Sequence, residues 1–455
     1  MTNQIVTVNV SQTIAPTPSK LQRTGAFISQ GGTNLAANAK TLLTQLSDLT
    51  PILATGQALA SLAWSGGTVT GTTSTAHGYP NGQTISLTIA GATPSGYNGT
   101  YNCTITGTTT FTYALVGNPG AETVPGTVVS ANAAQLTAMA TTFFAQPGQV
   151  SVYVLELGPG DAAHGVTALQ AYITANPGVI YSYLIPRGWD AESTYPAFLH
   201  NYNSTTAKTY FYTTVTLASY SNITNLDKCA PMLIEAPGIP STEFTMAAMF
   251  WTTLNANPSS ANKVPPLSYS YLVGVTAYPI TNSVATTLKA ANVNYVTTGA
   301  EGGISNTILV WGNMPDGRPW NYWYSTDWSQ INLELDLANE IINGSNTSIN
   351  PLYYNPDGVN RLQARAVKTM TNAVSYGLAL GQVIQTQLDP DTFAANVSAG
   401  VYAGQVVVNA VPFSTYVAQN PSAYSQGEYD GLAAVYTPAR GFAQIIFNLN
   451  VTDFA

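Results

Sequence analysis

Charge is scarce in this sequence. Only 7% of its 455 residues are Asp, Glu, Lys or Arg, against about 25% in an ordinary soluble domain. Acidic residues outnumber basic ones by 21 to 13, and the formal net charge is -8. A surface that binds a nucleic-acid backbone needs clustered basic side chains, so the composition argues against such a protein. A free monomer with so little charge is poorly protected against association, whereas a subunit whose surfaces are covered in an assembly needs less protection.

Cysteine and histidine are also rare. Cys103 and Cys229 have no second cysteine at CxxC spacing, which excludes a zinc ribbon or a redox motif. Cys103 lies in a strand-like run and is expected to be a buried apolar side chain. The histidines lie in different segments without a second metal ligand nearby, so we expect no metal site and no cofactor: His77, His164 and His200. His77 lies in a turn context and is expected to make a local hydrogen bond.

Motifs of catalysis are missing or incomplete, so we expect no enzyme. Residues 160–167 match the glycines of a phosphate-binding loop, but Val166 stands where lysine is required. The Trp- and Tyr-rich stretch 320–328 resembles a sugar platform, although such aromatic density is also common at protein interfaces. The carboxylates nearby are Asp316, Asp327, Glu334 and Asp336. A glycosidase needs two carboxylates at a set separation, so a carbohydrate-active hydrolase is a minor alternative.

No targeting or membrane segment is predicted. The chain begins without a basic segment followed by an apolar one, which argues against a signal peptide. No apolar run approaches the roughly 18 residues that span a bilayer. We therefore expect the chain to be made in a cytoplasm.

Both ends of the chain instead have the pattern of a strand. Apolar and polar residues alternate in 5–11 and in 445–451, and Pro16 and Pro18 end the first segment. An isolated strand is not stable alone, so each end must join a sheet elsewhere. We predict strand exchange between subunits through Ile5, Val6, Val8, Val10, Ile445, Phe447, Leu449 and Val451.

The fold class predicted between these ends is α/β plus α+β, in several domains. Residues 1–20 are an N-terminal strand arm and linker, and 21–61 with 131–300 form an α/β middle domain. Strands and helices alternate in 150–300, which implies a mainly parallel sheet. Residues 62–130 are Thr- and Gly-rich with turn signals, and they are predicted to form an inserted all-β surface module. Helical segments are expected within 25–51.

Residues 301–455 are predicted to form an α+β domain that ends in the second strand arm. A helix is expected over 328–342 with Gly344 as its cap, then a second helix over 357–380 and a strand over 406–411. Arg361, Arg365 and Lys368 share one face of the second helix. They either pair with acids of the first helix, such as Glu334 and Glu340, or contact an acidic partner.

The order of these parts resembles the tail sheath proteins of contractile bacteriophages (myophages). The likeness is clearest in residues 321–381, with the loop Asn355-Pro356-Asp357 between two helices, and in the final strand 441–451. The start, with residues 5–11 followed by Gly25-Ala26-Phe27-Ile28, is similar too. Residues 95–100 of the insert resemble a small β module that recurs in phage tail proteins.

The resemblance implies a structural subunit that polymerises helically around a tail tube and contracts to drive the tube through the host envelope for genome delivery. The implied partners are neighbouring copies of itself, the tail tube protein, and the baseplate and tail terminator proteins, without direct nucleic-acid contact or membrane insertion. The implied location is the virion tail, after assembly in the host cytoplasm. Because the C-terminal unit of a sheath lies against the tube, Arg361, Arg365 and Lys368 are the tube-facing candidates. Another particle protein, such as a tail fibre, tube or decoration subunit, is the alternative.

Overall fold

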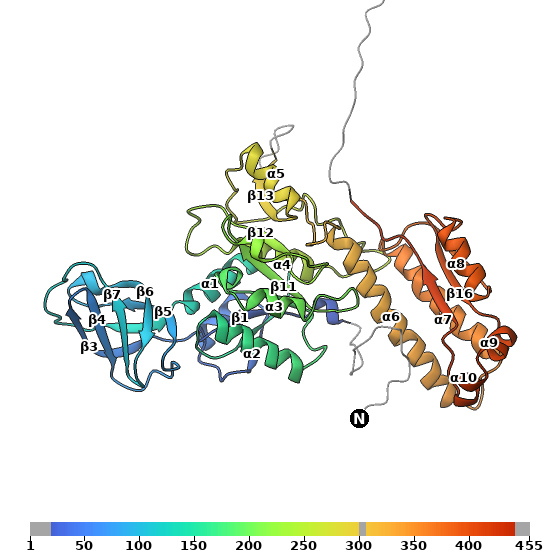
Figure 1. Ribbon diagram of the computed structural model, residues 1–455, viewed down its shortest axis with the longest axis horizontal. Helices are drawn as coiled ribbons and strands as arrows, with labels where there is room; N and C mark the ends of the chain where they lie inside the picture. Colours follow the sequence, from blue (N-terminus) through green and yellow to red (C-terminus); the bar gives the residue numbers. More distant parts are fainter. Residues whose placement is uncertain (1–19, 300–305, 442–455) are drawn as a thin grey trace, which may run out of the picture.

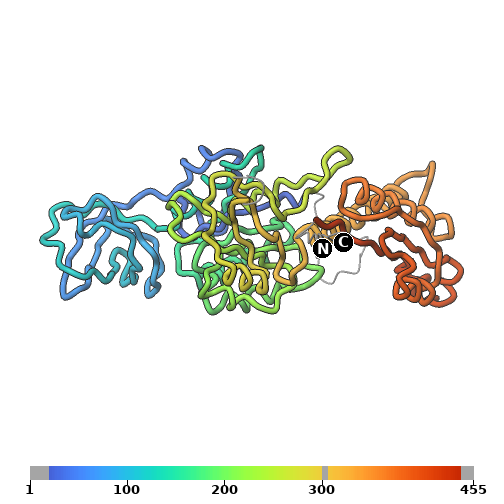
Figure 2. The backbone as a smooth tube through the Cα atoms, turned by 90° about the horizontal axis from the view of Figure 1, so that it is seen from above, coloured from blue at the N-terminus to red at the C-terminus, as the bar shows by residue number. Residues whose placement is uncertain are grey.

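The structure, a computed structural model, describes residues 20–299 and 306–441. These residues form an elongated molecule with a β-barrel at one end, a large sheet covered by helices in the middle, and a helical C-terminal unit with a small sheet at the other end (Figures 1 and 2). The chain is therefore a mixed α/β protein of several units.

The middle unit is built on an eight-stranded sheet. Its order is β14 (Thr307–Val310), β13 (Asn294–Thr298), β12 (Met232–Ile234), β11 (Tyr210–Val215), β10 (Ser182–Leu184), β1 (Gly25–Ser29), β9 (Val152–Glu156) and β2 (Lys40–Leu43). The six strands from β13 to β9 pair in parallel, while β14 and β2 pair antiparallel at the edges. The expected mainly parallel sheet is confirmed.

Helices cover both faces of this sheet because its strands bury side chains on both sides. Alternate residues of β1 enter different cores, with Phe27 on one face and Ala26 and Ile28 on the other. On the Phe27 side lie α1 (Asn132–Phe144) and α4 (Thr245–Leu254), and on the opposite side lie α2 (Ala162–Ala175) and α3 (Tyr195–His200). The helix α5 (Asn282–Ala290) precedes β13, and the short 3-10 helices are Leu21–Arg23, Leu46–Ile52, Ser95–Tyr97, Trp189–Ala191 and Tyr220–Asn222.

The expectation of helical segments within 25–51 is met only by a 3-10 helix, and no α-helix forms there. Lys40–Leu43 forms the edge strand β2, which pairs antiparallel with β9, and Leu46–Ile52 forms a 3-10 helix. Pairing with a strand that is distant in sequence outweighs the helix propensity of Ala and Leu in this segment.

Residues between this edge and α1 form the closed barrel. Its order is β3 (Gln57–Ser65), β4 (Thr68–Thr73), β7 (Thr110–Ala114), β6 (Gly99–Ile105), β5 (Thr84–Ala90) and β8 (Thr127–Ser130). Phe111 fills the interior where Gly71 has no side chain, since a Cβ there would lie 2.4 Å from the ring. Cys103 is buried as predicted, and burial raises the pKa of its thiol to about 12. His77 accepts a hydrogen bond from the backbone N–H of Tyr79 at 3.1 Å, which confirms the local contact.

The C-terminal unit has two long helices against a small sheet. Its elements are α6 (Trp320–Ser345), α7 (Pro356–Ser375), β15 (Val383–Thr386), α8 (Pro390–Ser398), β16 (Val406–Ala410), α9 (Phe413–Gln419), α10 (Pro421–Gln426) and β17 (Leu432–Val435). Gly344 does not cap α6 but lies inside it, where a Cβ would come within 2.3 Å of Leu352. The helix α7 ends at Ser375, so the expected extension to Leu380 is wrong, and Leu380 is exposed.

Candidate assembly surfaces

The C-terminal sheet has unpaired edges. Its order is β15-β16-β17, so β16 lies in the middle and every residue of β16 is buried. Within residues 20–299 and 306–441, no strand pairs with the outer side of β15 or of β17. Ile384 of β15 is 36% exposed, although it is apolar. An open strand edge presents backbone donors and acceptors that can pair with another strand, so these edges are candidate assembly surfaces.

A buried glutamine holds the sheet on α7. The amide nitrogen of Gln363 donates to the carbonyl oxygen of Thr386 at 2.6 Å and to that of Val408 at 3.0 Å. Its side-chain oxygen accepts from the Gln385 amide at 2.8 Å. Gln363 is fully buried, and its donors and acceptor are satisfied by the two strands. The edge strand β15 is therefore fixed in place without a neighbour on its outer side.

The described chain starts and ends beside the first turns of α6. Near the start, the Gln22 amide donates to the carbonyl of Tyr324 at 3.0 Å. Near the end, the N–H of Ala439 donates to the carbonyl of Leu378 at 2.9 Å, and the Arg440 guanidinium lies 5.5 Å from the centre of the Tyr322 ring. The residues predicted for strand exchange, in 5–10 and 445–451, lie outside the described residues.

Two of the three tube-facing candidates have partners within the chain. Arg361 pairs with Glu340 at 2.5 Å, and Arg365 pairs with Asp336 at 2.5 Å. Both acids belong to α6, so these pairs hold α6 and α7 together. Lys368 is exposed and forms no ion pair with the described residues.

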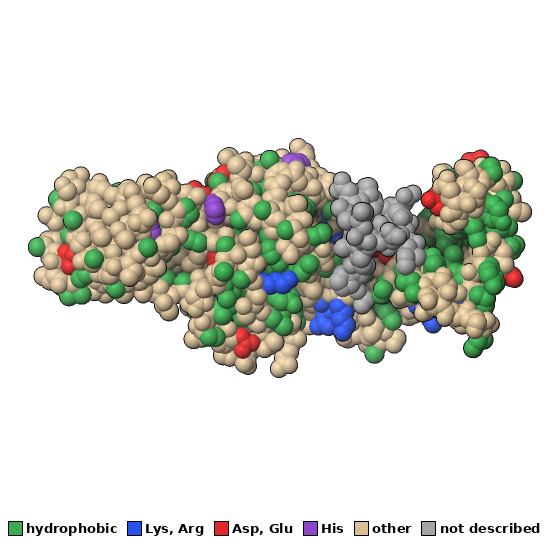
Figure 3. Space-filling view, turned by 90° about the horizontal axis from the view of Figure 1, so that it is seen from below, with side chains coloured by type: hydrophobic (Ala, Val, Ile, Leu, Met, Phe, Trp, Pro, Cys, Tyr) green, Lys and Arg blue, Asp and Glu red, His purple; other side chains and the backbone are tan. Residues whose placement is uncertain are grey.

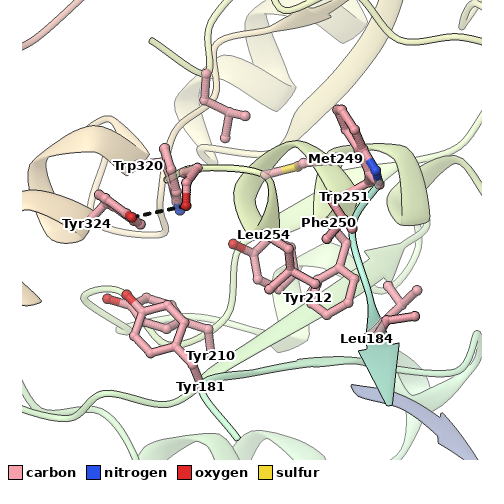
Figure 4. Packing of buried hydrophobic residues seen from close by; sticks show 14 of the residues in the cluster. Tyr181, Leu184, Tyr210, Tyr212, Met249, Phe250, Trp251, Leu254, Trp320 and Tyr324 are labelled. Atoms are coloured by element: carbon pink, nitrogen blue, oxygen red, sulfur yellow. Dashed lines mark hydrogen bonds between the residues drawn. The ribbon is translucent and has the colours of Figure 1, made fainter. Parts of the chain in front are cut away.

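A buried ion pair joins the large sheet to α6. The ammonium of Lys228, just before β12, lies 2.8 Å from Asp327 Oδ1, and both side chains are fully buried. The hydroxyls of Tyr181 and Tyr210, whose rings lie 4.8 Å apart (Figure 4), each donate to Asp327 Oδ2 at 2.7 Å. Burial, and then the charge of Asp327, raise the pKa of both tyrosines well above the usual value. The network fixes the junction between the two units, because a buried charge is tolerated only with such partners.

Sequence reasoning missed this network, although one signal for it exists. Asp327 follows Trp320 and Tyr324 at helical spacing and precedes Ile331 by one more turn, so it lies on the buried face of α6. A carboxylate on an apolar helix face predicts a buried partner. No comparable pattern marks Lys228.

The resemblance of residues 320–328 to a sugar platform does not hold in the structure. Trp320, Trp323, Tyr324 and Trp328 lie on α6, and each is at most 9% exposed. The neighbouring carboxylates have partners as well: Asp316 accepts from Trp323, Asp327 from Lys228, Glu334 from Lys208 and Asp336 from Arg365. These aromatic side chains are core residues, which present no face to a sugar ring.

A cavity of about 520 Å³ lies at the carboxyl ends of β10, β11 and β12, where α/β folds often bind ligands. Arg187 at its rim is held by both oxygens of Glu235, at 2.6 and 3.0 Å. Glu235 also accepts from the N–H of Thr245 at the start of α4. Its carboxylate therefore occupies the position at the helix N-terminus that a bound anion would take. The cavity therefore offers no free counter-charge to a phosphate or carboxylate from Arg187 or from this helix end.

Metal sites and membrane spans are not found in the described parts of the chain. In residues 20–299 and 306–441, no group of His, Cys, Asp and Glu side chains is arranged to hold a metal ion. Over the same ranges, every helix is too short or too polar to cross a bilayer.

Two solved structures are similar to the chain over its whole length. The first comes from the baseplate of the anti-feeding prophage (AFP). The two sequences are 12% identical, the alignment covers 99% of this chain and 100% of the AFP chain, and the TM-score is 0.53. The second is the AFP helical sheath in its contracted state, at 11% identity, 98% and 99% coverage, and a TM-score of 0.52. No protein family and no curated protein matches the sequence. The chain therefore has the fold of contractile tail sheath-like proteins, as the resemblance predicted.

Proposed function

We propose that this protein is the sheath subunit of a contractile phage tail. It would polymerise helically around a tail tube, remain extended until triggered, and contract to drive the tube through the host envelope for genome delivery. Its partners would be neighbouring copies, the tube protein, and the baseplate and terminator proteins. The particle would be assembled in the host cytoplasm.

The open C-terminal sheet carries this proposal. Its unpaired edges lie in the C-terminal unit, where the described chain ends. The described chain also starts beside α6 of that unit. A terminal arm of one copy can therefore reach the sheet of a neighbour and add a strand to it. Backbone ladders give affinity with little side-chain charge, which agrees with a charged fraction of 7%. The full-length similarity to the AFP sheath supports the same function.

Contact with the tube must be weak, because it breaks during contraction. Among the predicted tube-facing residues, Lys368 is the exposed one, and Arg361 and Arg365 hold α7 against α6. Exposed ion pairs stabilise a contact by only about 0.2–1 kcal/mol each, which suits a reversible contact. We propose that Lys368 contacts the tube and that the two arginines position the helix that presents it.

The test is assembly of the chain with and without its ends. Full-length protein and a variant lacking residues 1–15 and 442–455 would be concentrated and imaged by negative-stain electron microscopy. Striated tubes from the full chain and none from the truncated chain are the expected result. Monodisperse monomers from both would refute polymerisation by arm exchange.

A second candidate is a sheath-like ring subunit at the baseplate, because one of the similar structures comes from a baseplate. A ring closes, whereas a sheath continues as an open helix. Images of the full-length assembly separate the two: short closed rings at every protein concentration favour the baseplate, and tubes that lengthen with concentration favour the sheath.

A further inference from the structure

Beyond α7, acidic and basic residues of the C-terminal unit are separated along the chain. Between Lys368 and Arg440 the sequence has no Lys or Arg, but it has four acids, Asp389, Asp391, Glu428 and Asp430. None of these acids forms an ion pair with the described residues. In Figure 3, acidic side chains lie at the outer end of this unit, while basic ones lie nearer the middle of the molecule.

Strand register brings these acids to one end of the sheet. Thr386 at the end of β15 pairs with Asn409, and Ala410 at the end of β16 pairs with Leu432 at the start of β17. Asp389 and Asp391 lie at the start of α8, a short loop after β15, and Glu428 and Asp430 lie in the loop that leads into β17, so all four belong to this end. We call this group, Asp389, Asp391, Glu428 and Asp430, the acidic end.

Basic residues gather toward the opposite end, near the start of α6 and the end of α7. We call this group the basic collar: Lys20, Arg23, Lys263, Arg318 and Arg440. The guanidiniums of Arg318 and Arg440 lie 4.7 and 5.5 Å from the centre of the same Tyr322 ring. Lys263 packs its stem beside Gly377, which follows α7.

Most of the collar lacks an acidic partner within the chain. Arg318 pairs with Asp316 at 3.6 Å, while Lys20, Lys263 and Arg440 are exposed and form no ion pair with the described residues. Arg23 Nε is buried without a hydrogen-bond partner in the same part of the chain. Such unmatched charges steer association toward a surface of the opposite sign.

We propose that the acidic end of one copy docks on the basic collar of a second copy. The proposal rests on the proposed function, in which copies of the chain assemble. The two surfaces are different, so the contact is heterologous, and repeated head to tail it builds an open helical polymer. The described chain starts at Lys20 and ends next to Arg440, both in the collar. Docking thus brings Lys20 and Arg440 of the second copy, from which its terminal segments continue, to the sheet of the first.

The experiment reverses each surface separately in the full-length chain. The end variant carries Glu428→Lys and Asp430→Lys, which spares Asp389 because it caps α8 by accepting from the N–H of Thr392. The collar variant carries Lys263→Glu and Arg440→Glu. A control variant carries Lys40→Glu and Lys289→Glu at exposed sites of the middle unit and has the same net charge as the collar variant. Assembly is followed by light scattering and sedimentation.

Each variant alone should need about a tenfold higher protein concentration to assemble, because attraction is replaced by repulsion. An equal mixture of the two variants should assemble like the wild type, because the new basic end fits the new acidic collar. The control should assemble normally. Wild-type assembly should weaken as NaCl rises from about 0.05 to 0.5 M, since salt screens exposed charges.

The outcomes distinguish this contact from the function on which it rests. Normal assembly of both variants, or a mixture that stays impaired, would overturn the contact and leave the proposed sheath function intact. A wild-type chain that remains monomeric at every salt concentration would overturn both. Circular dichroism spectra identical to the wild type exclude misfolding as the cause of a loss.

Discussion

The two ends of the molecule solve the problem of sheet edges in opposite ways. The barrel closes its sheet, so every strand has a neighbour on each side. The C-terminal sheet leaves the outer sides of β15 and β17 unpaired in the described structure. From Leu49 to Ala121 the sequence has no charged residue, whereas between Lys368 and Arg440 the C-terminal unit has four acids and no basic residue. The barrel has no open strand edge, whereas the C-terminal sheet has edges that a further strand can join.

The attachments of the two ends to the middle unit differ as well. The barrel joins through neighbouring strands, since Gln57 of β3 pairs with Val128 of β8. The C-terminal unit joins through α6 and the buried pair of Lys228 and Asp327. The C-terminal unit is therefore tied to the large sheet by a buried contact, whereas the barrel is joined at two adjacent strands. Three predictions test this contrast.

Removing one member of the buried pair should have the largest effect. Lys228→Met leaves the Asp327 charge buried without its cation, which should lower the free energy of unfolding by about 3–5 kcal/mol. Native thiols report where the loss falls, because Cys229 adjoins the pair and Cys103 lies in the barrel, both buried. Labelling of Cys229 by a thiol reagent should accelerate by roughly a hundredfold or more, and labelling of Cys103 should not change.

The matched control is the double variant Lys228→Met/Asp327→Asn, which removes both charges but keeps a side-chain oxygen that can accept from Tyr181 and Tyr210. It should recover part of the lost stability in urea denaturation, because no unpaired charge stays buried. Equal acceleration at both cysteines would mean that the barrel and the junction unfold together and are not separate units.

The accuracy of sequence reasoning follows the same contrast. Local patterns located the start of α7 closely, since a helix is expected from 357 and α7 begins at Pro356, where the Asn355 side chain caps it. They also located β16, whose run of valines is buried on both faces. They failed at Lys40–Leu43, which forms a strand because it pairs with β9, a strand distant in sequence. They also failed at the start of α6, whose aromatic side chains are buried by contacts with distant segments. The pairing of Lys228 with Asp327 spans 99 positions, which no local pattern encodes.

A proline on the open edge should have the next largest effect. Val406 donates its N–H to Gln382, so by the parallel ladder the N–H groups of Val383 and Gln385 point away from β16. Gln385→Pro removes one outward donor, and it should raise the concentration needed for assembly about tenfold or abolish assembly. Gln385→Ala loses the same side chain but keeps the N–H, so it should assemble normally. If both variants assemble alike by light scattering, a neighbour does not extend the β15 edge.

Excision of the barrel should have the smallest effect, although it removes the most residues. Because Gln57 and Val128 are paired neighbours, replacing residues 57–129 by a few glycines joins points about 5 Å apart. The excision loses contacts such as the hydrogen bond from the Asp161 N–H to Gln83, at 3.1 Å. These contacts contribute only about 0.5–1.5 kcal/mol each, so the melting temperature should fall by a few degrees. The protein concentration needed for assembly, followed by light scattering, should stay within about threefold of the wild-type value. Glu122→Gln in the intact chain controls for loss of the barrel's charge. A shortened chain that stays folded but no longer assembles would show that the closed barrel contributes to the lattice as the open sheet does.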